Sequence, residues 1–181
     1  MKKMFRLLVV LAIIGMFAAY VQAESDQSQE LLKQTRALND NANQLGNAKV
    51  IAMLSGQLGI SPDVLTLQKQ QASLGYGELF IANSLAASLQ KQGSSKDFNA
   101  LVQEFQSGKG WGEIAQENGL KLGSVISGMK RSGAAMEREY KNQVQSQVRS
   151  TQEQRTGSES RHRTGQSQSG VVRGNKQAGR H

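Results

Sequence analysis

Apolar side chains recur at three- and four-residue spacing from residue 24 to residue 140, which is the spacing of one face of an α-helix. The same stretch contains a single proline, few runs of β-branched residues and no alternation of apolar and polar positions. Strands are therefore not indicated. The pattern predicts an all-α fold, a small bundle of about six or seven short helices.

Turn and capping residues divide this pattern into helices. Leu31, Leu38 and Leu45 share one face of the first helix, although the Asn and Asp residues at 39–43 favour a break there. Ser61, Pro62 and Asp63 are typical of a helix start, and Gly59 is typical of a helix end. The later helices are predicted at residues 51–58, 61–73, 76–92 (between Gly75 and Gly93), 95–108 (capped by Ser95), 111–119 and from about 122 past 140.

A short element occurs twice, about 35 residues apart: Gly75-Tyr76-Gly77-Glu78-Leu79 and Gly110-Trp111-Gly112-Glu113-Ile114. Each copy leads from a loop into a helix, so we predict two repeated helical hairpins, at about residues 59–92 and 93–119. We expect each aromatic ring to fill the gap between hairpins and each glutamate to favour the positive end of a helix dipole. The alternative is a platform for stacking a sugar or a peptide. The candidate ligand or packing residues are Tyr76, Glu78, Trp111 and Glu113.

These paired aromatic-glycine-glutamate segments resemble uncharacterised exported bacterial proteins that carry GYGE and GWGE segments. The resemblance covers about residues 55–125. It implies export and a helical fold, and it brings no known activity.

Residues 111–131 also resemble a helix-turn-helix, with Ala115 at the helix crossing, Gly119 in the turn, and Leu120 and Val125 buried. The segment departs from that family at Asn118, where an apolar residue is expected, and at Gly128 inside the second helix. The candidate base contacts, Lys121, Ser124, Ser127 and Lys130, include no arginine before Arg131. We therefore interpret the pattern as two helices that cross tightly, and we expect no sequence-specific DNA binding.

The formal net charge of +8 is unevenly distributed. Residues 24–140 hold 11 basic and 12 acidic residues, whereas residues 141–181 hold 8 basic and 2 acidic residues, a net of +6. This basic tail is poor in apolar residues, so we expect it to be disordered from about Ser150 onward. It is predicted to contact an anionic surface or polymer, or else only to solubilise the chain. The candidate contacts are Arg149, Arg155, Arg161, Arg163, Arg173, Lys176 and Arg180.

The N-terminus has the order of regions found in an export signal: Lys2, Lys3 and Arg6, then an apolar run over 7–20, then small residues up to Ala23. We predict a signal peptide over residues 1–23, cleaved after Ala23, and a periplasmic or secreted protein without a transmembrane helix in its mature chain. The alternative is an uncleaved anchor. The chain has no cysteine, which excludes disulfides, thiol catalysis and lipid attachment at a cysteine.

Groups that carry out catalysis are scarce. Both histidines, His162 and His181, fall in the basic tail, so the helical core domain at 24–140 holds no histidine for a catalytic triad or a metal site. Glu78 and Glu113 are the one pair of carboxylates at matching positions of the repeat, as a two-carboxylate enzyme would need. Their position in the first turn of a helix, where a negative charge is favourable, explains both without catalysis. We therefore expect no catalytic, cofactor or metal site.

The sequence indicates an exported, non-enzymatic interaction module with a basic arm for anionic partners, and a protein partner stays open. The alternatives are a helix-turn-helix DNA-binding protein with an N-terminal membrane anchor, and a cell-wall-active enzyme.

Overall fold

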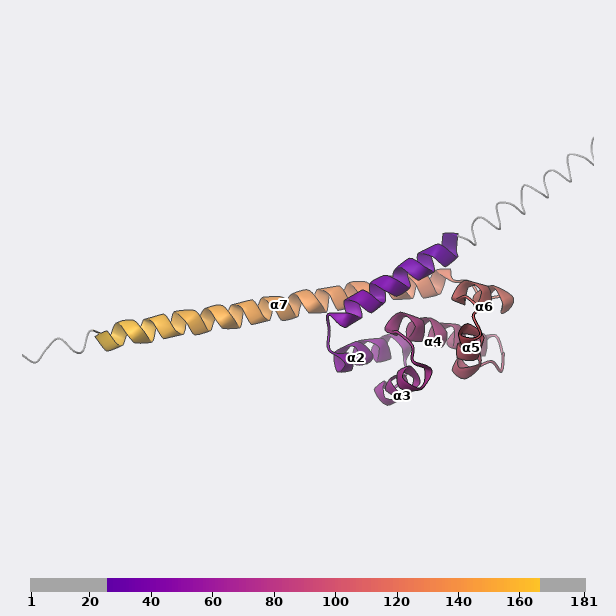
Figure 1. Ribbon diagram of the computed structural model, residues 1–181, viewed down its shortest axis with the longest axis horizontal. Coiled ribbons are helices and arrows are strands. Elements are labelled where there is room, and N and C mark those ends of the chain that lie inside the picture. Colours follow the sequence, from indigo (N-terminus) through magenta and orange to yellow (C-terminus); the bar gives the residue numbers. More distant parts are fainter. Residues whose placement is uncertain (1–25, 167–181) are drawn as a thin grey trace, which may run out of the picture. The chain divides into compact units, whose positions relative to one another are not determined.

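The computed structural model describes residues 26–166, and the regular secondary structure in this range is entirely helical. The predicted signal peptide at 1–23 lies outside the described residues. An N-terminal helix covers residues 26–43 and is followed by six labelled helices (Figure 1). These are α2 (Asn47–Leu58), α3 (Pro62–Ala72), α4 (Tyr76–Lys91), α5 (Phe98–Gln106), α6 (Trp111–Glu117) and α7 (Gly123–Gln166). The all-α bundle that the sequence predicts is confirmed.

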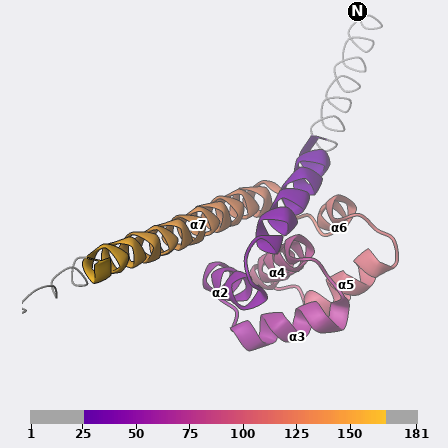
Figure 2. The same cartoon turned by 60° about the vertical axis from the view of Figure 1, so that its left-hand side comes forward.

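The chain divides into two compact units within α7, the first ending at Arg138 and the second beginning at Glu139. The described part of the first unit holds the N-terminal helix, α2 to α6 and the first turns of α7. The described part of the second unit is the remainder of α7, to Gln166. In the first unit, the N-terminal helix and the start of α7 lie along one side and α2 to α5 along the other (Figures 1 and 2).

Helix α4 is the centre of the first unit, and it contacts α2, α3 and α5. The sequence predicts one buried face for it, but Phe80 and Ile81 outside that face are also buried. A helix that is apolar around most of its circumference must be covered on several sides. The surrounding helices cover α4 in this way, and therefore the two hairpins pack around one shared core.

The predicted break at residues 39–43 does not occur, because the N-terminal helix is continuous to residue 43. The side chains of Asn39 and Asn41 form hydrogen bonds with other helices instead of competing for their own backbone. Asn39 Oδ1 accepts from the Gly77 amide at 2.8 Å, and Asn41 Nδ2 donates to the Gly133 carbonyl at 3.2 Å. Tertiary contacts thus override the low helix propensity of asparagine.

Helix α5 starts later than predicted. Ser95 does not cap it; Asp97 does, with Oδ1 accepting from the Ala100 amide at 2.9 Å. Asp97 directly precedes Phe98, the first residue of the buried stripe, so it is the polar residue best placed to pair with the free first-turn amides. Ser61 caps α3 as predicted, accepting from the Val64 amide.

Helix α7 continues to Gln166, so the structure differs from the predicted disorder over residues 150–166. Its first turns are packed in the first unit, and this packing offsets the cost of nucleating a helix. The Gln, Glu and Arg residues that follow are favourable helix formers, so the helix can propagate along a polar sequence. Residues 167–181, with Arg173, Lys176 and Arg180, lie outside the described residues.

Among residues 26–166, no single helix combines the length and the apolar composition of a membrane span; only α2 and α3 taken together pass that test, and they are bent by 111°.

Candidate functional site

The two repeated elements adopt the same local structure. Gly75 and Gly110 each precede the first turn of a helix in an extended conformation, with φ and ψ of −68° and 169° and of −75° and 149°. The aromatic residue that follows is the first helical residue, and the Tyr76 and Trp111 side chains are buried. The sequence repeat therefore corresponds to a structural repeat, although α4 has 16 residues and α6 has only 7.

The second glycine of each element contacts the N-terminal helix. A Cβ atom on Gly77 would lie 2.7 Å from Thr35 Cγ2 and 2.8 Å from the Thr35 carbonyl oxygen, and one on Gly112 would collide with Ser28 Oγ. Ser28 and Thr35 are seven positions apart, about two turns of one helix face. The two glycines thus allow one helix to pack closely against both hairpins.

A polar clamp strengthens the first of these contacts. The Gly77 amide is one of the first-turn N–H groups that have no partner within their own helix, and a glycine cap offers no side chain to pair with it. Asn39 accepts from this amide and donates through Nδ2 to Glu78 Oε2 at 3.2 Å. Glu78 therefore positions the N-terminal helix, whereas Glu113 is exposed. The two glutamates differ in role despite their matching positions.

Each aromatic ring is enclosed in a different way. Trp111 stacks on Phe105 with ring centroids 4.4 Å apart and an interplanar angle of 11°, and its Nε1 has no hydrogen-bond partner. The Tyr76 hydroxyl donates to Asn47 Oδ1 at 2.7 Å, and Lys69 Nζ lies 4.7 Å from the centroid of its ring. Burial raises the pKa of Tyr76. Both aromatic side chains are buried, as expected of residues that pack in the core.

Tyr76 also lines a surface groove of about 490 Å³ between α2 and α3. Ile51 and Pro62 make part of its wall apolar, and Lys69 is the one charged side chain among the described residues that line it. The remaining lining residues are Asn47, Ala48, Thr66 and Gln70. Tyr76 is thus the residue through which the first repeated element borders a surface groove.

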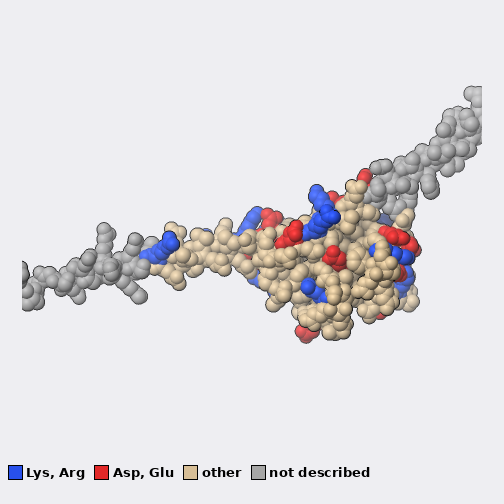
Figure 3. Space-filling view, viewed as in Figure 1, with Lys and Arg blue, Asp and Glu red and all other residues tan. Residues whose placement is uncertain are grey.

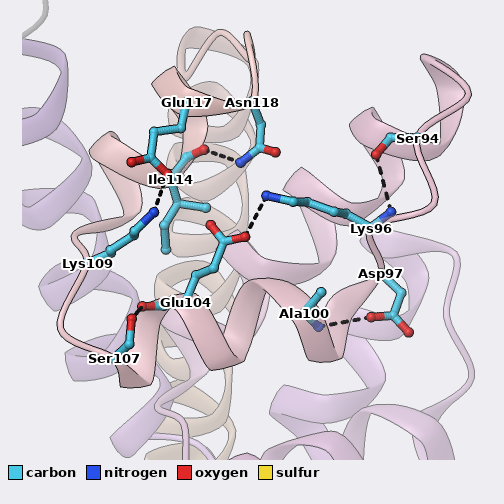
Figure 4. A network of polar contacts seen from close by, with 10 residues as sticks. All are labelled: Ser94, Lys96, Asp97, Ala100, Glu104, Ser107, Lys109, Ile114, Glu117 and Asn118. Atoms are coloured by element: carbon cyan, nitrogen blue, oxygen red, sulfur yellow. Dashed lines mark hydrogen bonds and ion pairs between the residues drawn. The ribbon is translucent and has the colours of Figure 1, made fainter.

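Two acidic side chains of the α5–α6 hairpin, Glu104 and Glu117, are held by lysines from the neighbouring loops (Figure 4). Glu104 Oε1 pairs with Lys96 Nζ at 2.6 Å, and Glu117 pairs with Lys109. The hydrogen bond that Lys109 donates to Glu117 raises the pKa of Lys109. Asn118 Nδ2 donates to the Ile114 carbonyl at 2.7 Å, which explains a polar residue at a position where a helix-turn-helix has an apolar one. The two ion pairs and the Asn118 hydrogen bond therefore stabilise the fold of this hairpin.

The helix that would read DNA in a helix-turn-helix is packed against other helices in this structure. Lys130 of α7 forms a 2.7 Å ion pair with Glu30 of the N-terminal helix, and Gln57 of α2 donates to the Gly128 carbonyl at 3.3 Å. The hydrogen bond from Asn41 to Gly133 adds a second contact with the N-terminal helix. A recognition helix must enter the major groove with a free face. The residues considered for base contact, Lys121, Ser124, Ser127, Lys130 and Arg131, are all exposed, but Lys130 is already paired with Glu30.

The predicted arm residues lie on α7 or beyond it. Lys141, Arg149 and Arg155 are exposed on the second unit. Arg161 and Arg163 fall within α7. Among the described residues, no group of three or more His, Cys, Asp or Glu side chains is arranged to hold a metal ion.

Sequence reasoning missed the residues that receive the two repeated elements: Ser28, Thr35, Asn39 and Asn47. The one feature of the local sequence that could have indicated them is that each is a polar residue within a helix whose apolar positions form one face. For Asn39 that signal suggested a helix break, because the partner of the side chain lies about 40 positions away in the sequence.

These features define an all-α bundle whose N-terminal helix packs onto two aromatic-glycine-glutamate turns. No protein-family model, curated protein or solved structure matches the chain. The resemblance to exported bacterial proteins with GYGE and GWGE segments stays a prediction.

Proposed function

We propose that the protein is an exported, non-enzymatic interaction protein, whose basic segment over residues 141–181 contacts an anionic partner in the cell envelope. The observation that carries this proposal is the separation of charge: residues 24–140 have a net charge of −1 and residues 141–181 a net charge of +6. In the first unit, acidic and basic side chains occur side by side on the face shown in Figure 3. The surplus positive charge is thus available to an anionic surface.

The arrangement of the described arm residues supports a surface contact. Lys141, Arg149 and Arg155 are exposed, and at 100° per residue their positions fall within about 120° of the circumference of α7. Cations grouped on one side of a helix can approach one anionic surface together. An anionic phospholipid surface or an acidic polymer provides the required charge.

The rival functions have less support from the contacts. The Glu78 carboxylate is bonded to Asn39, and the Tyr76 and Trp111 rings are buried, so these residues serve the packing of the core better than an enzymatic cleft. DNA reading by residues 111–131 would require Lys130 to leave its ion pair with Glu30.

The test compares the full chain with a variant in which the seven candidate residues, Arg149, Arg155, Arg161, Arg163, Arg173, Lys176 and Arg180, are replaced by glutamine. Binding is measured to anionic vesicles, to neutral vesicles and to a mixed-sequence DNA duplex, at low and at physiological salt. The expected result is salt-sensitive binding of the native chain to anionic vesicles, with little preference for a sequence or head group, and its loss in the variant.

A matched control replaces the six arginines of this set by lysine, which preserves the charge and should preserve binding. A second control, Arg36→Gln with Lys121→Gln, removes two exposed charges from the first unit and should leave vesicle binding unchanged. Tight, salt-resistant and sequence-selective DNA binding by the glutamine variant would overturn the proposal in favour of the helix-turn-helix segment.

A further inference from the structure

A second groove lies between α4 and the start of α7, within the first unit. Its volume is about 290 Å³. It holds two basic side chains, Lys91 from α4 and Arg131 from α7, and three serines, Ser84, Ser88 and Ser124. None of the described residues that line it is acidic. Positive charge and hydroxyl groups therefore face the same concave surface from two helices.

The two cations of this groove are not neutralised. Neither Lys91 nor Arg131 has a hydrogen-bond or ion-pair partner among the described residues, whereas Lys96, Lys109 and Lys130 in the same unit each pair with a glutamate. Because opposite charges attract, a groove lined by two cations and by no carboxylate among the described residues favours an anionic occupant.

The wall that carries Arg131 is fixed by close packing. A Cβ atom on Gly128 would lie 2.8 Å from Phe80 Cζ, so the absence of a side chain lets α7 pack directly on the buried Phe80 ring. The same hypothetical Cβ lies 3.9 Å from one terminal nitrogen of Arg131, which places the guanidinium back over its own helix, at the groove wall. Gln57 holds this turn through its 3.3 Å hydrogen bond to the Gly128 carbonyl. The Arg131 guanidinium is thus carried on a turn of α7 that is held in place by packing and by a hydrogen bond.

We propose that this groove binds the phosphate group of a phosphoester. A guanidinium offers two parallel N–H donors that match the oxygens of a phosphate, and an ammonium adds a mobile charge. The Ser84 and Ser124 hydroxyls donate to the remaining oxygens, whereas the Ser88 hydroxyl donates to the Ser84 carbonyl at 2.8 Å. The volume is at the lower end of the range for small-ligand sites, which suits a phosphate with a short polar body. The phosphoester is either a soluble metabolite or the head group of an anionic lipid.

This site is separate from the basic arm, and different residues test it. The probe is glycerol 3-phosphate, titrated into the full chain by calorimetry, with glycerol as the probe that lacks the phosphate. Saturable binding of glycerol 3-phosphate is expected, with no binding of glycerol. Lys91→Gln and Arg131→Gln should each weaken the affinity roughly tenfold, the effect of one charge-assisted hydrogen bond.

Lys121→Gln and Arg36→Gln are the matched controls, because each removes one exposed positive charge of the first unit outside the groove. They should bind as the native chain does. Both groove side chains are exposed, so melting temperatures equal to that of the native chain are expected for all four variants. Absence of saturable binding, or equal weakening in groove and control variants, would overturn the proposal.

Competition distinguishes the two sources of the phosphoester. Vesicles of an anionic phospholipid are added to the glycerol 3-phosphate complex of the variant that lacks the seven basic arm residues. Displacement of the probe assigns the groove to a lipid head group. Retention of the probe assigns it to a soluble phosphoester, and either result is consistent with the site.

Discussion

Gly77 packs against Thr35 at a distance that leaves no room for a side chain: a Cβ atom would lie 2.7 Å from Thr35 Cγ2 and 2.8 Å from the Thr35 carbonyl oxygen. The second of these neighbours is backbone, so a side-chain rotation cannot relieve the contact. Gly112 makes the corresponding contact with Ser28, two turns earlier on the same helix, but there the nearest atom is a side-chain oxygen. The repeated glycine therefore allows close packing of the N-terminal helix at both sites, but a side chain at Gly112 should be tolerated better than one at Gly77.

Gly77→Ala should lower the free energy of unfolding by about 2 to 3 kcal/mol, the upper part of the range for overpacking, because the N-terminal helix must move away from α4. Gly112→Ala should cost less, about 1 kcal/mol, and Ser28→Ala should relieve part of that cost. Denaturant unfolding of the single and paired variants measures these differences.

Gly56→Ala is the control for this series. Gly56 lies in α2, and a Cβ atom there has nothing within 4 Å, so alanine should stabilise the helix by about 0.5 to 1 kcal/mol. If Gly77→Ala and Gly56→Ala changed stability in the same direction, close packing of the N-terminal helix would not explain the repeated glycine.

The aromatic residues of the two repeated elements should contribute to stability as core residues. Trp111→Ala and Tyr76→Ala are each expected to destabilise the protein by about 3 kcal/mol, the scale of removing a buried aromatic side chain. Tyr76→Phe keeps the ring and loses only the hydrogen bond to Asn47, so about 1 kcal/mol is expected. Glu113→Gln, at the exposed helix start, should cost less than about 1 kcal/mol. Thermal melts provide the comparison, and unchanged melting of both alanine variants would indicate an exposed binding platform.

Stability should fall at alkaline pH because of Tyr76. Burial raises the pKa of Tyr76 in the folded protein above the ordinary value of 10.0, so the folded state keeps a proton that the unfolded chain releases. This contribution to stability is complete below pH 10.0 and is lost as the pH rises through the folded pKa. Urea unfolding across this range should show a steeper decline for the native chain than for Tyr76→Phe. Tyr140→Phe, on the exposed part of α7, is the control, and equal declines in the native chain and Tyr76→Phe would contradict the prediction.

The mature protein should begin at Glu24 and be recovered outside the cytoplasm, because the basic, apolar and small-residue regions of 1–23 occur in the order that export requires. N-terminal sequencing of the protein from cell fractions provides the test. Leu11→Arg with Ile14→Arg should prevent export, since a charge in the apolar segment opposes its insertion. Full-length native chain recovered in the cytosol would refute the signal.

The local sequence determined the helical fold and most of its divisions. Gly59, with a φ of 69°, supplies the left-handed residue that follows the end of α2 at Leu58, and Ser61 caps α3 in front of Pro62. Each of these features acts within one turn of a helix, so it can be recognised from neighbouring residues alone. The separation of charge between residues 24–140 and 141–181 is likewise a property of the sequence.

Tertiary structure decided the roles of several residues whose partners are distant in the sequence. The sequence suggests that Asn39 ends a helix, but its side chain accepts a hydrogen bond from the Gly77 amide and the helix continues. Gly128 has a low helix propensity, but its lack of a side chain allows α7 to pack on Phe80. Lys91 and Arg131 share a groove only because α4 and α7 lie side by side. The physical reason is that helix propensity and hydrophobic period act over one or two turns, whereas close packing and a shared charged surface depend on which helices meet.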